Sequence, residues 1–187
     1  MTFSQSLLTW YRKNRRSLPW RETKDPYAIL VAEVMLQQTQ VKTVLPYYKR
    51  WMARYPTIQD LAGASEADIL KSWEGLGYYR RVHLLQQAAR FIVSQCDGNF
   101  PKTIDELSQL PGVGRYTLGA VASIAFDLPL PVLDGNVTRV LARYFGIRQA
   151  VSRADTRKTL WQQAEQFLAQ VPQGQAGDFN QALMELG

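Results

Sequence analysis

Apolar residues recur at helical spacing along most of the chain. Only "LPLPVLD" (128–134) has an extended character, and its two prolines favour a stiff connector over a strand. The recurrence at i, i+3, i+4 and i+7 predicts an all-α protein. The expected helices cover 3–12, 26–38, 41–54, 80–95, 115–126, 137–145 and 156–170.

Capping residues predict where several helices begin. Asp25 precedes Pro26, which suits the first helical position because proline has no N–H to satisfy there. Thr103 and Glu106 have the spacing of a capping box, in which each side chain binds the other residue's backbone N–H. The N-caps expected from such patterns are Asp25, Ser65, Thr103 and Asp155.

Composition indicates a globular protein. Hydrophobic residues make up 46% of 187 residues, enough for one compact domain or two small lobes. No apolar run approaches the roughly 20 residues that cross a bilayer, and the N-terminal charges follow the apolar residues, unlike a signal peptide. We expect a cytoplasmic, nucleoid-associated location. The chain stops inside the amphipathic pattern "FNQALMELG" without a cap, so we expect it to be truncated.

The charge balance suits a polyanionic partner. Lys and Arg number 22 against 16 Asp and Glu, giving a formal net charge of +6. In "YRKNRR" (11–16) and "YYRR" (78–81), bases alternate with aromatic residues, a combination that contacts phosphates and stacks on nucleobases. Cys96 is the single cysteine and His83 the single histidine. Together they cannot form a four-ligand zinc site, and we expect a structural thiol and a surface imidazole.

The segment "LPGVGRYT" (110–117) places a bare turn between two helical patterns. Gly112 and Gly114 allow close backbone approach to a ligand, and the helix expected from Arg115 would present free N–H groups to an anion. The turn could hold a phosphate, or it could be a simple corner between helices. The residues alone leave both interpretations open.

Two carboxylates stand apart from the solvated acids of the polar faces. Glu33 lies in "YAILVAEVML", where a carboxyl group must be paired, protonated or functional, and desolvation would raise its pKa. Asp134 precedes a glycine and a helix, so it is either an N-cap or an anion kept charged for function. One protonated acid and one anion would suit hydrolysis of a glycosidic bond.

Longer motifs carry a family resemblance that extends over nearly the whole chain. "LPGVGRYTLGAVASIAF" and "LPVLDGNVTRVLARYFGI" resemble the helix–hairpin–helix, Gly/Pro…Asp superfamily of DNA glycosylases. "LPWR", "DPYAILVAEVMLQQTQVKTVLPYY" and "WEGLGYYRR" are similar to the adenine DNA glycosylase family of the MutY type. The resemblance implies a six-helix barrel lobe over 22–130, with the helix–hairpin–helix at about 106–126, and a second helical lobe from 1–21 and 131–187.

The resemblance also implies roles for three catalytic residues. Glu33 would protonate adenine mispaired with 8-oxoguanine or guanine and then help to activate water. Asp134 would stabilise the oxocarbenium-like sugar, electrostatically or by transient covalent trapping. Tyr116 stands where bifunctional relatives resembling endonuclease III carry a lysine, which implies a monofunctional enzyme; a core or surface tyrosine is the alternative.

Further positions match the family's binding residues. The resemblance places an adenine pocket at Arg16, Leu18, Trp20 and Gln181. Duplex contacts would come from Gln38, Thr39, Leu76, Tyr78, Gly112, Val113, Gly114 and Asn136. Leu76 between two glycines is expected to project from an exposed loop. A monovalent cation is expected at the carbonyls of Ser108, Leu110 and Val113.

Some features of the family are missing from this sequence. Family members carry four cysteines for a 4Fe–4S cluster and a second, Nudix-like domain that recognises 8-oxoguanine, and this chain has neither set. The resemblance implies a monomer acting on double-stranded DNA with adenine opposite 8-oxoguanine or guanine. The alternatives are a glycosylase with another base preference, such as thymine opposite guanine, and a non-catalytic DNA-binding module.

Overall fold

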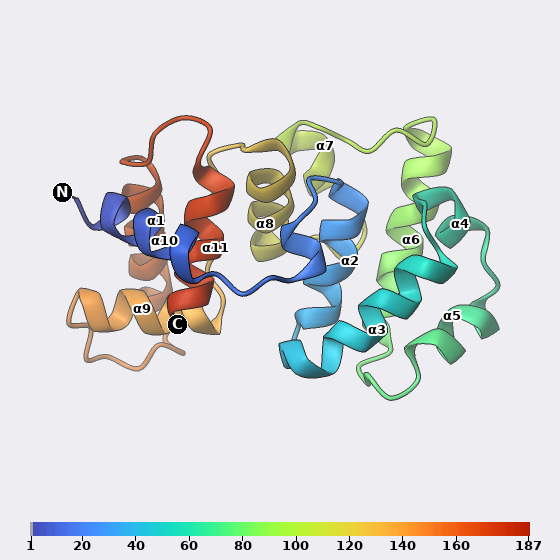
Figure 1. Ribbon diagram of the computed structural model, residues 1–187, viewed down its shortest axis with the longest axis horizontal. Coiled ribbons are helices and arrows are strands. Elements are labelled where there is room, and N and C mark those ends of the chain that lie inside the picture. The colour runs from blue at the N-terminus through green and yellow to red at the C-terminus, as the bar shows by residue number, and fades with distance from the viewer. Residues whose placement is uncertain (1) are drawn as a thin grey trace. The chain divides into compact units, whose positions relative to one another are not determined.

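The computed structural model describes residues 2–187, and within this range it contains helices and no strand (Figure 1). The expected all-α class is confirmed. The chain divides into a central unit, residues 17–117, and a terminal unit, residues 1–16 and 118–187. The division falls inside α8 (Arg115–Phe126), whereas the lobe boundary expected from the sequence lay in the connector near 130.

The central unit is built around α2 (Pro26–Leu36). Residues 27–35 are all buried, and α2 packs against a short 3₁₀ helix, α3 and α6. Helix α4 lies along α6, and α5 contacts α3 and α6. The other elements are η1 (Pro19–Arg21), α3 (Val41–Arg54), α4 (Ile58–Gly63), α5 (Glu66–Trp73), α6 (Arg80–Gln95) and α7 (Ile104–Ser108).

Local chemistry fixes both ends of α2. The Asp25 carboxylate accepts the Tyr27 N–H at 3.0 Å, and Pro26 occupies the first helical position, as expected. The Tyr27 hydroxyl donates to the Tyr55 carbonyl at 2.8 Å, which ties the start of α2 to the end of α3. Gln38 has a left-handed backbone (φ +56°), so α2 ends at Leu36, two residues before the predicted boundary.

The terminal unit packs four helices with the greater part of α8. Helix α11 contacts α1 and α9, and α9 contacts α10. Figure 1 shows the blue α1 and the red α11 side by side, although they come from opposite ends of the chain. These helices are α1 (Phe3–Asn14), α9 (Gly135–Tyr144), α10 (Ala154–Leu168) and α11 (Ala176–Leu186).

A buried amide holds the connector that leads into α9. Asn180 is 1% exposed, and its Nδ2 donates to the Ser123 hydroxyl and to the Leu130 carbonyl, both at 2.8 Å. The connector is irregular, as its prolines predict. Because a buried amide without partners is costly, these bonds fix the path of the chain toward Asp134.

Most predicted helices and caps are confirmed. The side chains of Ser65 and Thr103 accept the backbone N–H groups of Asp68 and Glu106. Asp155 is not the N-cap of α10, contrary to expectation, because the extended backbone of Arg153 starts that helix. Asp155 instead lies in the first turn, where its carboxylate pairs with Arg153 at 2.9 Å. The six-residue α4 was missed, since it is too short to show a period.

No helix in the described residues has the length and apolar character to cross a membrane.

Replacing Gly177 by alanine tests the packing of α11 on α8. A Cβ at this position would lie 2.5 Å from the Ser123 carbonyl oxygen and 2.9 Å from the Ile124 Cα, so backbone must move. We expect Gly177→Ala to lower the free energy of unfolding by about 1–3 kcal/mol, measured by urea denaturation. Gly63→Ala is the control, because its Cβ would meet nothing within 4 Å. Equal effects of the two substitutions would contradict the close approach.

Candidate active site

The central unit buries a carboxylate against a tyrosine. Glu33 is 4% exposed on α2, and the Tyr116 hydroxyl donates to its Oε2 at 2.7 Å. The two residues are 83 positions apart and meet because the first turn of α8 lies beside α2. A carboxyl group that accepts a hydrogen bond from a phenol is oriented at a fixed place, which suits a proton donor or acceptor.

The bare turn before α8 is exposed and tightly closed. Gly112 and Gly114 are exposed, and the Val113 N–H donates to the Leu110 carbonyl at 3.1 Å. Gly112 has a φ of +78°, and a Cβ there would lie 2.7 Å from the Leu84 Cβ. Both the backbone angle and the space therefore require glycine at position 112. The turn joins α7 to α8, so the helix–hairpin–helix arrangement is present.

A groove of about 410 Å³ lies between the segment after α2 and the segment before α6. It is lined by Gln37, Gln38, Tyr78, Tyr79, Arg80, Arg81 and Leu84. Gln38 and Tyr78 both have left-handed backbones, at φ +56° and +49°, which is uncommon for residues other than glycine. Such conformations concentrate at functional sites, because the surrounding structure must hold them.

Two residues of the 75–81 loop differ from expectation. Leu76 is 5% exposed and does not project, whereas Tyr78 is 60% exposed. The loop folds around Arg81, whose guanidinium binds the Leu76 and Gly77 carbonyls and turns the leucine inward. Arg81 itself is 8% exposed, so it is not one of the surface bases suggested by the "YYRR" pattern.

Leu18 and Trp20 lie in the central unit, and each is 6% exposed. The Trp20 ring meets the Tyr48 ring edge to face, with centroids 5.0 Å apart. Burial raises the pKa of Tyr48 to about 12, so its hydroxyl stays protonated and neutral. These side chains are fixed by packing between η1 and α3.

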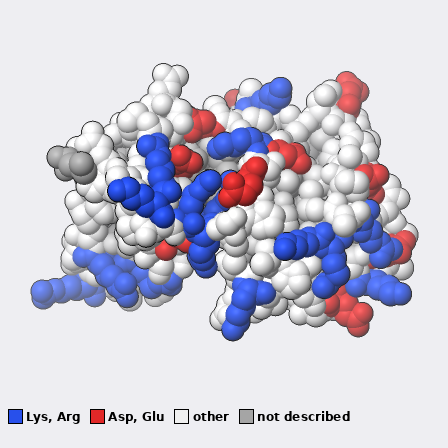
Figure 2. Space-filling view, viewed as in Figure 1, with Lys and Arg blue, Asp and Glu red and all other residues white. Residues whose placement is uncertain are grey.

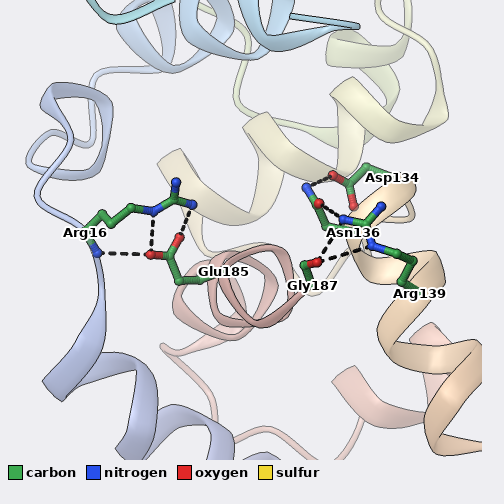
Figure 3. A network of polar contacts seen from close by, with 6 residues as sticks. All are labelled: Arg16, Asp134, Asn136, Arg139, Glu185 and Gly187. Carbon is green, nitrogen blue, oxygen red and sulfur yellow. Dashed lines mark hydrogen bonds and ion pairs between the residues drawn. The ribbon is translucent and has the colours of Figure 1, made fainter. Parts of the chain in front are cut away.

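The terminal unit holds Asp134 in a chain of polar contacts that Figure 3 shows. The Asp134 Oδ1 accepts the Val137 N–H at 2.7 Å, so the residue is the N-cap of α9. Its Oδ2 accepts the Asn136 amide N–H at 2.8 Å. Arg139 donates to the Asn136 side-chain oxygen and, at 2.8 Å, to the Gly187 carbonyl. The N-cap role and a functional role are compatible, because both oxygens are oriented by donors.

A second polar group in Figure 3 joins Arg16 to α11. The guanidinium donates to the two Glu185 carboxylate oxygens at 2.8 and 2.7 Å, and the Arg16 backbone N–H donates to the same carboxylate at 3.1 Å. This hydrogen bonding raises the pKa of Arg16 above its ordinary value. Gln181, one helical turn before Glu185, is 5% exposed, and its Nε2 lies 3.4 Å from the Gly177 carbonyl oxygen.

The predicted site residues thus form groups within each unit. Glu33 meets Tyr116 in the central unit, and Asp134 meets Asn136 in the terminal unit. The sequence did not indicate the partners Glu185, Arg139 and Arg81. Glu185 carries the same signal as Glu33, a single acid within an apolar helix pattern, and could have been found by it.

The described residues do not fit an iron–sulfur cluster. Cys96 is the only cysteine, and no group of three or more His, Cys, Asp and Glu residues in 2–187 could hold a metal ion. His83 lies at the surface with its Nδ1 3.5 Å from the Glu66 carboxylate. A 4Fe–4S cluster needs four cysteine thiolates, so no cluster chemistry is assigned to these residues.

Known proteins are similar to this chain over nearly its full length. Adenine DNA glycosylases of Rattus norvegicus and Homo sapiens are each 49% identical over 194 residues, covering 99% of this chain and 37% and 35% of their own lengths. An adenine DNA glycosylase of Buchnera aphidicola (Schizaphis graminum) is 41% identical over 186 residues, covering 53% of its length. The chain spans about a third to a half of these relatives.

Solved structures share the fold. A thermostable thymine-DNA glycosylase superposes with a TM-score of 0.84 at 33% identity, over 97% of this chain and 82% of that one. A trapped endonuclease III–DNA covalent intermediate gives 0.76 at 22% identity over 100% and 87%. Residues 31–166 match the family described as HhH-GPD superfamily base excision DNA repair protein. The chain belongs to the HhH-GPD superfamily of base excision DNA repair proteins.

Proposed function

We propose that this chain carries the catalytic part of an adenine DNA glycosylase, which hydrolyses the N-glycosidic bond of adenine mispaired with 8-oxoguanine or guanine. The observation that carries the proposal is the buried Glu33 carboxylate oriented by Tyr116. The base preference is supported by adenine DNA glycosylases 40–49% identical to the chain, including relatives from Rattus norvegicus and Homo sapiens.

The reaction requires that the adenine leave the base stack, since its glycosidic bond is unreachable inside a duplex. Glu33, in its protonated form, then donates its proton to a ring nitrogen of the adenine. The C1′–N9 bond breaks, and its electron pair goes to N9. Water adds to C1′ and gives up one proton, which restores the Glu33 carboxyl group. The Tyr116 hydroxyl keeps the carboxyl group aimed through both steps.

Asp134 supplies the negative charge that the sugar needs while its positive charge develops. Its two oxygens are fixed by the Val137 N–H and the Asn136 amide, so little reorganisation accompanies the reaction. We propose that the carboxylate stabilises the oxocarbenium-like sugar electrostatically or by transient covalent trapping. Asn136 has a positioning role toward this aspartate.

The adenine would be held by Arg16, Leu18, Trp20 and Gln181. Trp20 offers an aromatic face and Gln181 an amide that can both donate and accept, which suits a purine. Glu185 supports this assignment because its bidentate pairing fixes the direction of the Arg16 guanidinium.

Duplex contacts would come from the exposed turn and the groove of the central unit. The N–H groups around Gly112, Val113 and Gly114 suit a phosphate, and the exposed ring of Tyr78 suits stacking where the adenine has left. Gln38 and Thr39 would probe the opposite strand. Figure 2 shows basic side chains over much of the face viewed, with a group at the lower left over α9, which suits a DNA backbone.

We further propose a monomer, with a monovalent cation at the carbonyls of Ser108, Leu110 and Val113. The Leu110 carbonyl already accepts the Val113 N–H, and its second lone pair remains suited to a cation. No reaction step depends on this ion.

A second candidate function is removal of thymine opposite guanine. It is favoured by the thymine-DNA glycosylase that superposes with a TM-score of 0.84. Duplexes carrying adenine opposite 8-oxoguanine, adenine opposite guanine and thymine opposite guanine distinguish the two candidates. Strand breaks after alkali treatment report base release. Release of thymine alone would replace the adenine proposal.

Substituting Glu33 tests the proposed acid. Glu33→Gln keeps the shape but removes the transferable proton, so the single-turnover rate of adenine release should fall roughly a hundred- to ten-thousandfold. Duplex affinity should stay within threefold. Glu66→Gln is the matched control, because Glu66 is exposed and its printed contact is with His83 alone. Adenine release by Glu33→Gln at the rate of the unaltered chain would refute the role.

Substituting Asp134 tests the proposed anion. Asp134→Asn keeps an oxygen for the Val137 N–H but removes the charge, so adenine release should slow by roughly a hundred- to a thousandfold. The measurement is again a single-turnover rate at saturating enzyme, with thermal melting to confirm the fold. Asp155→Asn, at an exposed aspartate paired with Arg153, should leave the rate unchanged. If both variants behave alike, Asp134 is only an N-cap.

The identity of residue 116 predicts base removal without strand cleavage. Tyrosine has no amine to form a Schiff base with the sugar, so borohydride should trap no covalent protein–DNA adduct. The strand should stay intact until alkali is added, as judged by denaturing gels. Endonuclease III run in parallel is the positive control. Adduct formation at the control's efficiency would contradict the monofunctional assignment.

A further inference from the structure

Arg81 is buried at the start of α6 and bound almost entirely to main-chain carbonyls. Its Nη1 donates to the carbonyls of Val34, Met35 and Gln37, at distances from 2.5 to 3.0 Å. Its Nη2 reaches the carbonyls of Leu76 and Gly77 at 3.2 Å, and the Thr39 hydroxyl at 3.3 Å. One guanidinium therefore joins two segments that lie about 40 residues apart in the sequence.

No carboxylate among residues 2–187 neutralises this guanidinium. Burial lowers the pKa of Arg81 from its ordinary value, although the group remains a cation at neutral pH. Its partners are carbonyl dipoles and the rings of Trp73 and Tyr78, whose centroids each lie 5.4 Å from its Cζ. A charged group buried without a counter-ion is costly, so its retention calls for a specific role.

At the end of α2, Arg81 supplies what the helix itself lacks. The last carbonyls of any helix have no intrahelical donor, and the helix dipole makes that end negative. The fork of Arg81 binds three carbonyls there, and the chain leaves the helix at Gln37 and Gln38. The position of the 37–39 segment therefore depends on this cation.

At the start of α6, the same fork holds the 75–78 loop. The Gly77 carbonyl accepts hydrogen bonds from both Arg81 and the Trp73 indole, which is fully buried. Tyr78 follows at once in its left-handed conformation, with its ring 60% exposed. Gln38 and Tyr78, both in strained backbone conformations, thus face one groove from the two segments that Arg81 joins.

Glu33 does not depend on Arg81 in the same way. It lies inside the buried stretch 27–35 of α2, and Tyr116 orients its carboxyl group from α8. Loss of Arg81 would release the segment after the helix before it moved the helix interior.

We propose that Arg81 is a positioning residue that sets the spacing of the 37–39 and 75–78 segments, and thereby the preference of the groove for a duplex with a mispaired adenine over a fully paired one. The inference rests on the proposed function for its ligand. It assigns Arg81 to recognition of the opened duplex, while Glu33 and Asp134 perform the chemistry.

The test uses the intact chain and the variants Arg81→Lys and Arg81→Met. Lysine keeps the charge, but its single nitrogen cannot bind both segments as the guanidinium fork does. Arg90→Lys and Arg90→Met are matched controls, because Arg90 lies on the same helix, is exposed and donates to one carbonyl, that of Ala62. Duplex affinity is measured with 2′-fluoro-deoxyadenosine opposite 8-oxoguanine, which resists hydrolysis, and with adenine opposite thymine.

We expect Arg81→Lys to reduce the ratio of the two affinities at least tenfold. The single-turnover rate at saturating enzyme should stay within threefold, and the Arg90 variants should keep both quantities. Hydrogen exchange should quicken in peptides covering 36–41 and 74–80 and remain unchanged in 26–33. Arg81→Met should show the same pattern more strongly; if it does not fold, the result for Arg81→Lys decides.

Three results would overturn the proposal. They are an affinity ratio like that of Arg90→Lys, a loss confined to the saturated rate, and exchange that quickens evenly across the central unit or a failure of Arg81→Lys to fold. Failure of the unaltered chain to release adenine would instead refute the proposed function. The exchange pattern would still show whether Arg81 holds the two segments.

Discussion

Glu33 sits in a helix whose neighbouring residues are buried and largely aliphatic, and a carboxyl group in such surroundings is costly unless a donor meets it. The donor is Tyr116, at 2.7 Å, from the first turn of α8. That single bond requires α2 and the start of α8 to lie side by side. The exposed turn around Gly112, which leads directly into α8, is therefore held beside the same carboxylate.

The same physical rule recurs at Arg81, where the buried group is a cation. Its donors are shared between carbonyls at the end of α2 and carbonyls of the 75–78 loop. A guanidinium fork can serve several acceptors at fixed angles, which a lysine ammonium cannot. Buried charge in the central unit thus fixes two things separately, the acid inside α2 and the loops beyond its end.

In the terminal unit, carboxylates are again fixed by paired donors. Asp134 is held by the Val137 N–H and by Asn136, and Asn136 is held in turn by Arg139. Glu185 receives three hydrogen bonds from Arg16. In both groups the helix termini or helix faces supply the donors. Such preorganised anions and cations are what a charged transition state requires, because they need not reorient during the reaction.

Local signals in the sequence determined most of the helices. Proline and aspartate at 25–26, the capping box at 103–106 and the apolar periods specify helix starts and faces through interactions within a few residues. The isolated acid at Glu33 and the bare turn at 110–114 were also visible, because a charged residue in an apolar run and paired glycines are local anomalies. These features, with the motif order, sufficed to indicate the superfamily.

Only the tertiary structure decided which side chains those anomalies meet. Tyr116 is 83 residues from Glu33, and Arg81 lies more than 40 from the carbonyls it binds, so no local pattern encodes either contact. For the same reason Leu76 and Arg81, expected at the surface, are buried. Burial and long-range hydrogen bonding depend on how helices pack, and packing is a property of the whole chain rather than of any segment.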